Sequence, residues 1–174
     1  MQYKKFLLES IINQTEKIHI IDQTHIMEKD YAGNYADVNN LEELDLIEKL
    51  ANNPWRDVVR DRFAEKSPWL YQVIVDLGRA AFLDLINIKQ GGTYLDVGSG
   101  WGQVAIPLSK IGNVVVLDLT INRLKILEKI ALQEKSILNY VQGNFLTFPF
   151  RSNVFDFIVF NGSLEWIALG REKE

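Results

Sequence analysis

The 174-residue sequence contains no cysteine and only two histidines, His19 and His25. Without thiols the chain can form no disulfide, no thiolate metal site and no cysteine nucleophile. With so few imidazoles, a zinc site would depend on carboxylate ligands, and we therefore expect no metal.

The sequence also lacks a long apolar run and an excess of basic residues. No uninterrupted apolar stretch approaches the roughly 20 residues of a membrane span, and the first residues contain no stretch typical of a signal peptide. The chain has 19 basic and 23 acidic residues, a net charge of −4, which does not indicate nucleic-acid binding. We therefore expect a cytoplasmic protein that binds neither membranes nor nucleic acids.

The two halves of the chain differ in their apolar pattern, which predicts a helical segment over residues 1–90 and a second domain over residues 91–174. Gly91 and Gly92 separate them. The helices predicted in the first half cover residues 4–21, 41–50, 54–66 and 67–85, with Ser67 and Pro68 as the cap and first position of the last one.

The second half alternates short apolar runs with helical patterns. The predicted strands are residues 93–97, 114–118, 137–141 and 155–160, and the helices between the first three are residues 101–110 and a helix capped by Thr120. Strands of this kind, apolar on both faces and separated by helices, indicate a parallel sheet. The expected fold is α/β, a Rossmann-like sheet of about four strands with an N-terminal helical segment.

The most informative motif lies directly after the first predicted strand. Asp96 precedes three alternating glycines, Gly98, Gly100 and Gly102. Glycine lets the backbone adopt positive φ and approach a ligand closely. An acid in the same turn repels phosphate and attracts an ammonium or sulfonium group. The motif therefore favours a cationic ligand at the carboxyl ends of the strands, where open parallel sheets bind ligands.

A dinucleotide site is the alternative interpretation of this loop. Residues 100–105, Gly-Trp-Gly-Gln-Val-Ala, fit the permissive G-x-G-x-x-A pattern, and Asp118 fits the acid that binds a ribose. However, the matching glycines begin too late after the strand, and Asp96 would lie near the pyrophosphate. Like charges about 4 Å apart cost roughly 4 kcal/mol at an effective dielectric constant of 20.

Four segments in order resemble the class I S-adenosylmethionine-dependent methyltransferases. Residues 93–110 are similar to the first motif of the family, an acid before G-x-G-x-G, and residues 114–120 resemble its second strand with the terminal acid Asp118. Residues 142–150 resemble the adenine-binding segment, and residues 155–166 the fourth strand with the loop toward the methyl acceptor. The resemblance covers residues 92–167.

The resemblance implies S-adenosyl-L-methionine as cofactor, bound by Asp96, Gly98, Gly100, Gly102, Asp118, Leu119, Asn144, Phe145 and Asn161. Asp96 would support the ammonium group, the glycines would let the main chain pass under the methionine and ribose, and Asp118 would accept both ribose hydroxyls. A cap at the start of the next helix is the alternative role of Asp118. Asn144 replaces the usual aspartate of the family but keeps a carbonyl acceptor for adenine. Phe145 would stack on the adenine or pack in the core.

The sequence assigns no catalytic residue. Methyl transfer is an in-line displacement with a neutral leaving group, so much of the catalysis can come from alignment and desolvation. Oxygen and nitrogen acceptors often add a general base. The candidates are Glu165, His19, His25, Tyr31 and Tyr35, although Glu165 and the histidines fit exposed or helix-capping roles better.

The fourth strand has no partner on its outer side in the sequence given. The family sheet has seven strands, so residues 156–160 would form an exposed parallel edge. The chain is a fragment of a longer enzyme, or it pairs this edge with another chain, or the N-terminal helices cover it, and we favour the first account. The expected function is methyl transfer to a small-molecule acceptor. The alternatives are a cofactor-binding half-domain without transfer activity and an NAD-binding oxidoreductase domain.

Overall fold

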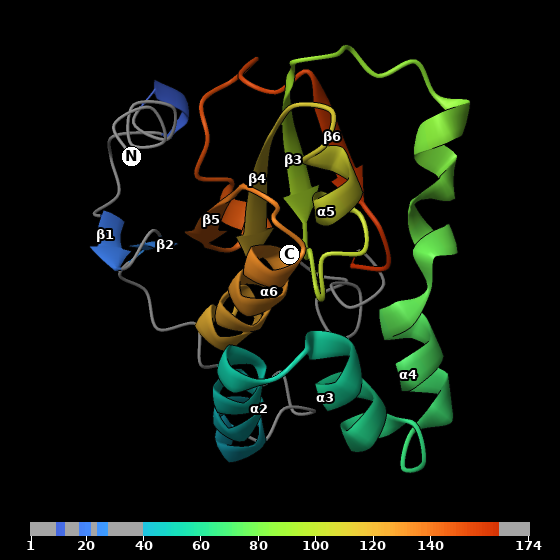
Figure 1. Ribbon diagram of the computed structural model, residues 1–174. Coiled ribbons are helices and arrows are strands. Elements are labelled where there is room, and N and C mark those ends of the chain that lie inside the picture. The colour runs from blue at the N-terminus through green and yellow to red at the C-terminus, as the bar shows by residue number, and fades with distance from the viewer. Residues whose placement is uncertain (1–9, 13–17, 22–23, 28–39, 164–174) are drawn as a thin grey trace, which may run out of the picture.

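The computed structural model describes residues 10–12, 18–21, 24–27 and 40–163, and their strands form one sheet of order β1-β2-β5-β4-β3-β6 (Figure 1). The strands are β1 (Ile18–Ile21), β2 (Thr24–Met27), β3 (Thr93–Val97), β4 (Asn113–Asp118), β5 (Leu138–Gln142) and β6 (Phe157–Phe160). The neighbours β5, β4, β3 and β6 are all parallel. The predicted Rossmann-like parallel sheet of four strands is therefore confirmed.

The register of these four strands brings their carboxyl ends together. Asp96 pairs with Val116, and Asp118 at the end of β4 pairs with Gln142 at the end of β5. β3 contributes alternate side chains to the two faces of the sheet, as the two-residue period of a strand requires. The loops that leave β3, β4, β5 and β6 consequently start at the same edge.

The prediction of a helix over residues 4–21 is wrong at residues 18–21, which the structure describes. Residues 18–21 form β1, which pairs antiparallel with β2, and β2 pairs in parallel with β5. β1 contains three isoleucines and β2 contains Thr24 and Ile26. These β-branched residues favour strands, and pairing with β5 overrides the helix-like spacing. The hairpin extends the sheet at the edge opposite β6, so β6 remains the outer strand among the described residues, with Ile158 43% exposed.

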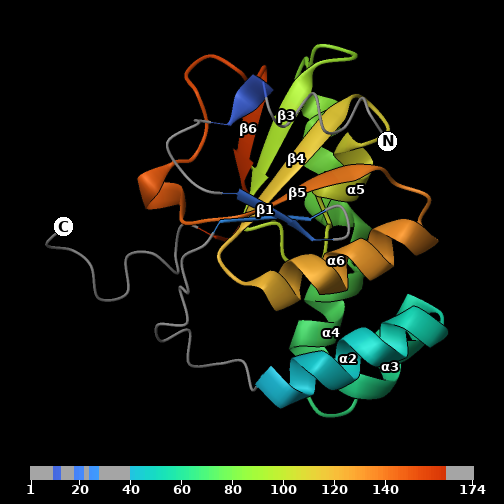
Figure 2. The same ribbon diagram turned by 90° about the vertical axis from the view of Figure 1, so that its left-hand side faces the viewer.

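Helices cover one face of the sheet. They are α2 (Asn40–Asn52), α3 (Trp55–Phe63), α4 (Pro68–Val75), α5 (Ala105–Leu108), α6 (Ile121–Gln133) and the 3-10 helix η1 (Leu77–Leu85). The short 3-10 helix η2 (Phe145–Thr147) belongs to the opposite face, where Phe145 joins the second apolar cluster. Side chains of α5, α6 and η1 pack on Tyr94, Val114 and Val116 of the strands in one apolar cluster. A second layer of helices, α2, α3 and α4, packs on the outer side of α6 (Figure 2).

Two predicted helices are shorter than their apolar pattern indicated. The helix predicted over residues 67–85 ends at Val75 and restarts as η1, because the side chain of Asp76 accepts a hydrogen bond from the Gly78 N–H at 2.8 Å and turns the chain. Of the helix predicted over residues 101–110, only Ala105–Leu108 is α-helical. Ser67 is the N-cap residue of α4, as predicted.

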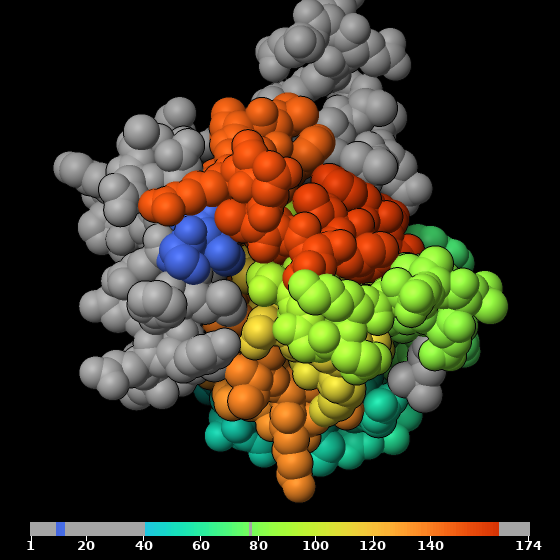
Figure 3. Space-filling view, turned by 90° about the horizontal axis from the view of Figure 1, so that it is seen from above, coloured from blue at the N-terminus to red at the C-terminus, as the bar shows by residue number. Residues whose placement is uncertain are grey.

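Over the described residues, the other face of the sheet is covered by residues 10–12, of which 10 and 11 are helical, and by the segment that contains Phe150. Leu95, Val115 and Val141 of the strands pack there against Ile12 and Phe150. Ile12 and Phe150 also form an isolated antiparallel bridge, and the Arg151 N–H donates to the Ile11 carbonyl at 2.9 Å. The space-filling view shows residues 10–12, in blue, against the orange surface of the segment around residue 150 (Figure 3).

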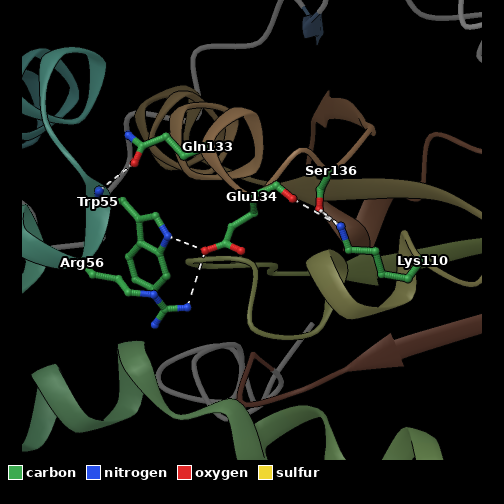
Figure 4. Close-up of polar contacts among 6 residues, drawn as sticks. All are labelled: Trp55, Arg56, Lys110, Gln133, Glu134 and Ser136. Atoms are coloured by element: carbon green, nitrogen blue, oxygen red, sulfur yellow. Dashed lines mark hydrogen bonds and ion pairs between the residues drawn. The ribbon is translucent and has the colours of Figure 1, made fainter.

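One glutamine joins the outer helices to α6 (Figure 4). Gln133 Oε1 accepts a hydrogen bond from the Trp55 N–H at 2.7 Å, and Gln133 Nε2 donates to the carbonyls of Leu50 and Asn53 at 2.8 and 3.0 Å. Beside it, Trp55 Nε1 donates to Glu134 Oε1 at 2.7 Å. The end of α2 and the start of α3 are thus both fixed to the last turn of α6.

Candidate functional site

The glycine loop follows β3 directly and turns the chain into α5. Gly98, Gly100 and Gly102 all have positive φ, at 68°, 53° and 85°. The Gly98 N–H donates to the Leu117 carbonyl of β4 at 2.7 Å, and the Gly102 carbonyl accepts from the Ile106 N–H at 3.0 Å. The loop is therefore tied to β4 at its start and to the first turn of α5 at its end.

The three glycines differ in what lies beside them. A β-carbon on Gly98 would lie 2.4 Å from Ser163 Cβ, and one on Gly102 would lie 2.4 Å from Leu127 Cδ1. A β-carbon on Gly100 would meet no described atom closer than 3.8 Å. Gly98 and Gly102 thus allow close packing within the protein, whereas a β-carbon on Gly100 would make only ordinary van der Waals contacts with Gln103 and Gly98.

Ser99 adds a polar group to the loop. It is 6% exposed, and its hydroxyl has no hydrogen-bond partner among the described residues. A buried hydroxyl without a partner costs roughly 1–3 kcal/mol. The loop therefore combines an open backbone position at Gly100 with a hydrogen-bonding group that the protein itself leaves unused, and such a loop fits a polar ligand.

Asp96 lies beneath this loop and is 2% exposed. Burial raises the pKa of its carboxyl to about 7, the backbone N–H of Ala105 opposes this rise, and the charge of Asp118 adds to it. Among the described residues no basic side chain offsets the burial of Asp96. A cation brought to this carboxylate by a ligand would supply the missing charge.

Asp118 ends β4 and takes part in the turn into α6. Its Oδ1 accepts hydrogen bonds from the N–H and the hydroxyl of Thr120 at 3.0 and 3.2 Å. Burial raises the pKa of Asp118, the Thr120 hydrogen bonds and the positive charge of Arg123 lower it, and the charge of Glu43 raises it. Thr120 is the N-cap residue of α6, as predicted, but makes no capping hydrogen bond through its own side chain.

The loop after β5 lies against the end of β4. The Gly143 N–H donates to the Asp118 carbonyl at 2.9 Å, and Gln142 Nε2 donates to the Leu119 carbonyl at 3.1 Å. The Asn144 side-chain carbonyl accepts from the Leu146 N–H at 2.9 Å and starts η2. Leu119 is therefore held at the same edge as Asp118, and one side-chain group of Asn144 is engaged in its own turn.

Phe145 packs against the apolar cluster on the face of the sheet opposite α5 and α6. Its ring meets the ring of Phe160 edge to face, with centroids 5.8 Å apart. The ring is half-buried. The structure thus shows the core contact that was one of the two roles considered for this residue.

The loop after β6 is fixed to both of its neighbours. Asn161 Nδ2 donates to the Arg79 carbonyl of η1 at 3.2 Å, and Ser163 Oγ donates to the Val97 carbonyl at 2.7 Å. Ser163 was not singled out from the sequence, because nothing in its local pattern shows that it packs on Gly98. The structure brings together, at one edge of the sheet, the ends and loops that carry all nine predicted cofactor-binding residues.

The pairing of Glu43 with Arg123 was also not predicted from the sequence. Arg123 Nε lies 2.8 Å from Glu43 Oε1 across the contact between α6 and α2. A signal was present for each. Glu43 falls at helical spacing with the apolar Leu46 and Leu50, on the buried side of α2, and Arg123 is a basic residue in the first turn of a helix.

The candidate general bases are not assembled at this site by the described residues. His19 and His25 lie on strands β1 and β2 at the sheet edge opposite β6, so their predicted place on a helix and at its end is wrong. Tyr31, Tyr35 and Glu165 lie outside the described residues. Within the described ranges no group of acidic and histidine side chains could hold a metal ion, and no helix is long and apolar enough to cross a membrane.

Comparison with known proteins assigns the second half of the chain to a family. Residues 95–173 match the family described as "Methyltransferase domain". The chain is 35% identical over 79 residues to 24-methylenesterol C-methyltransferase 3 of Arabidopsis thaliana, and 32% identical over 80 residues to demethylmenaquinone methyltransferase of Bacillus licheniformis. These alignments cover 42% and 44% of this chain but only 22% and 34% of the relatives, so the match spans about a third of their length or less.

Solved structures of methyltransferases are also similar to the chain. A Methanococcus maripaludis protein assigned to the S-adenosyl-L-methionine-dependent methyltransferases is 24% identical, with a TM-score of 0.48. The similarity covers 64% of this chain and 52% of that one. Residues 95–173 are thus similar to a methyltransferase domain, and the strands described there form a Rossmann-like parallel sheet.

Proposed function

We propose that the protein binds S-adenosyl-L-methionine at the glycine loop and transfers its methyl group to a small-molecule acceptor. The observation that carries this proposal is the pair of acids at the ends of adjacent strands, the buried Asp96 and the half-buried Asp118, beside the uncrowded backbone at Gly100. Both acids have raised pKa values because of burial. An arrangement of this kind gains stability from a ligand that brings a cation to one acid and hydrogen-bond donors to the other.

The residues present fit this cofactor group by group. Asp96 would hold its ammonium group, and the free hydroxyl of Ser99 would donate to or accept from its polar atoms. Asp118 would accept the ribose hydroxyls through charge-assisted hydrogen bonds, which are about twice as strong as neutral ones. The cofactor supplies a methyl group on a positively charged sulfur, and the protein contributes by binding, orienting and excluding water.

The roles of the remaining predicted residues stay proposals. Leu119 and Asn144 are held at the edge where an adenine would lie beyond the ribose, and the Asn144 side-chain carbonyl retains a second lone pair. Phe145 offers a half-buried ring beside them. Asn161 belongs to the loop that would face the methyl acceptor.

A small-molecule acceptor is supported by charge and by the relatives. The net charge of −4 provides no electrostatic attraction for nucleic acid. The two curated relatives are named for methyl transfer to a methylenesterol and to demethylmenaquinone, which are small molecules.

Thermal unfolding in the presence of S-adenosylhomocysteine and, separately, of NAD tests the cofactor. At a concentration 100 times Kd, a ligand that binds only the folded state adds about 2.7 kcal/mol, which raises the Tm of a chain this size by roughly 5–10 °C. We expect that shift with S-adenosylhomocysteine and none with NAD. The opposite result would favour an oxidoreductase domain.

Transfer is tested separately, with S-adenosylmethionine labelled on its methyl group and a cell extract as the source of acceptors. Label that passes to a small molecule supports the enzyme. Binding of S-adenosylhomocysteine without any transfer would instead favour a cofactor-binding half-domain.

A further inference from the structure

Gln103 joins the glycine loop to the outer helix α4. It lies directly after Gly102, and its Nε2 donates a hydrogen bond to the Val73 carbonyl at 3.1 Å. Because α4 ends at Val75, this carbonyl is among the last four of the helix, which have no N–H partner within an α-helix. The side chain of Gln103 therefore satisfies a carbonyl at the end of α4.

This hydrogen bond fixes the direction in which the Gln103 amide points. A carbonyl can only accept, so the amide nitrogen must face Val73 and the amide oxygen must face away from it. Gln103 Oε1 lies 3.8 Å from the position of a β-carbon on Gly100. No donor of the described residues is hydrogen-bonded to this oxygen. Gln103 thus places a free acceptor on the side of Gly100 that carries no side chain.

A second contact from the outer helices holds the same loop. Trp101, within the loop, is 8% exposed and belongs to the apolar cluster formed with α2, α3, α4 and α6. Its ring meets the ring of Phe63 of α3 edge to face, with centroids 5.7 Å apart. The loop is therefore held at Trp101 and the Gln103 amide at Val73. An acceptor held in this way loses little side-chain entropy when a ligand binds.

We propose that Gln103 is a further cofactor-binding residue, whose Oε1 accepts a hydrogen bond from the ammonium group of S-adenosyl-L-methionine. This inference rests on the proposed function, because it takes the glycine loop as the cofactor site. An ammonium group has three N–H donors and needs several acceptors. Asp96 would provide one acceptor and compensate the charge, and Gln103 would provide a second, neutral one. The outer helix α4 then contributes to cofactor binding by fixing the Gln103 amide.

Three ligands that differ in their amino-acid part test this contact. S-adenosylhomocysteine has the ammonium and carboxylate groups, its decarboxylated form has the ammonium group alone, and 5′-methylthioadenosine has neither. Titration calorimetry measures their affinities for the wild type and for Gln103→Met, which keeps the length of the side chain but lacks the amide. We expect both ammonium ligands to bind about tenfold more weakly or worse, because hydrogen bonds to charged groups are among the stronger ones. The affinity for 5′-methylthioadenosine should stay unchanged.

Two further variants separate this contact from the anchoring of α4. Gln103→Lys keeps a donor for the Val73 carbonyl but replaces the acceptor by a positive charge, which repels an ammonium group. It should retain most of the stability to urea that Gln103→Met loses, yet bind decarboxylated S-adenosylhomocysteine at least as weakly as Gln103→Met does. Gln72→Met makes the matched substitution at an exposed position of α4 and should leave all three affinities unchanged.

The three ligands also define the results that would overturn the inference. Equal losses of affinity for all three in Gln103→Met would mean that the residue supports the loop and not the ammonium group. A loss for S-adenosylhomocysteine alone would place the contact at the carboxylate, and unchanged affinities would exclude a contact. Each of these results would overturn the inference and leave the proposed function standing. A wild-type protein that bound none of the three ligands would overturn both.

Discussion

Ser163 lies against the side of Gly98 that carries no side chain, so that a β-carbon on Gly98 would lie 2.4 Å from Ser163 Cβ. Ser163 Oγ also donates to the Val97 carbonyl at 2.7 Å. The loop after β6 is thus held on the end of β3 by a close contact and a hydrogen bond. The first glycine of the motif serves this contact, while a β-carbon on Gly100 would cause no clash.

Gly98→Ala should therefore destabilise the protein more than Gly100→Ala. Both positions have positive φ, which costs an alanine roughly 1–2 kcal/mol. Gly98→Ala adds the clash with Ser163, for which overpacking costs about 1–3 kcal/mol more. Urea unfolding of the two variants measures the difference. Equal losses of stability would contradict the role assigned to Ser163.

The raised pKa of Asp96 predicts a fall in stability between about pH 4 and pH 7. In this range the folded protein keeps a proton on Asp96, whose pKa is about 7, while the unfolded chain has lost it. The folded state binds more protons, so the free energy of unfolding decreases as the pH rises, by up to about 4 kcal/mol in all.

Asp96→Asn is the matched variant, since its side chain does not titrate. It should lose this part of the pH dependence. The free energy of unfolding of the variant, relative to that of the wild type, should therefore be higher at pH 8 than at pH 4. Urea unfolding at both pH values gives the comparison. Identical pH dependence in the two proteins would contradict the burial argument for Asp96.

Asp118→Asn should weaken the binding of S-adenosylhomocysteine by about 10- to 150-fold, because hydrogen bonds to a charged group contribute roughly 1.5–3 kcal/mol. Asparagine keeps an oxygen that can accept from Thr120, so the turn into α6 should survive. Calorimetry measures the affinity and urea unfolding the stability. Unchanged affinity would leave Asp118 with a capping role alone.

Gln133→Ala should destabilise the protein by about 1–3 kcal/mol. The substitution removes the hydrogen bonds of Gln133 to the Trp55 N–H and to the carbonyls of Leu50 and Asn53, and a hydrogen bond of this kind contributes about 0.5–1.5 kcal/mol net. Leu132→Ala, at a neighbouring position that is 64% exposed, is the control and should change stability by less. Thermal unfolding distinguishes the two variants.

The parallel sheet could be predicted from the sequence because its strands are buried on both faces and carry continuous apolar runs. Val114 to Leu117 is such a run, and it is buried as predicted. The N-terminal hairpin could not be predicted in this way. Its strands are four residues each, and the partner that makes β2 a strand is β5, more than 100 residues further along the chain.

The edge of the sheet that carries the candidate site could likewise be predicted, because each predicted site residue lies in the last two residues of a strand or in the loop that follows it. Contacts between distant segments could not. Nothing near Gly98 in the sequence indicates Ser163, and nothing near Arg123 indicates Glu43, which pairs with it from a helix 80 residues earlier. Burial also sets the pKa values of Asp96 and Asp118, and a motif does not contain that information.

The most direct test of the account is calorimetric titration of the wild-type protein with S-adenosylhomocysteine at pH 6, in buffers of different ionisation enthalpy. We expect binding at one site per chain with release of a proton, because the ammonium group of the ligand favours the ionised form of Asp96. In Asp96→Asn the proton release should disappear. A protein that binds no S-adenosylhomocysteine, or binds it with no proton release, would contradict the site described for the glycine loop and Asp96.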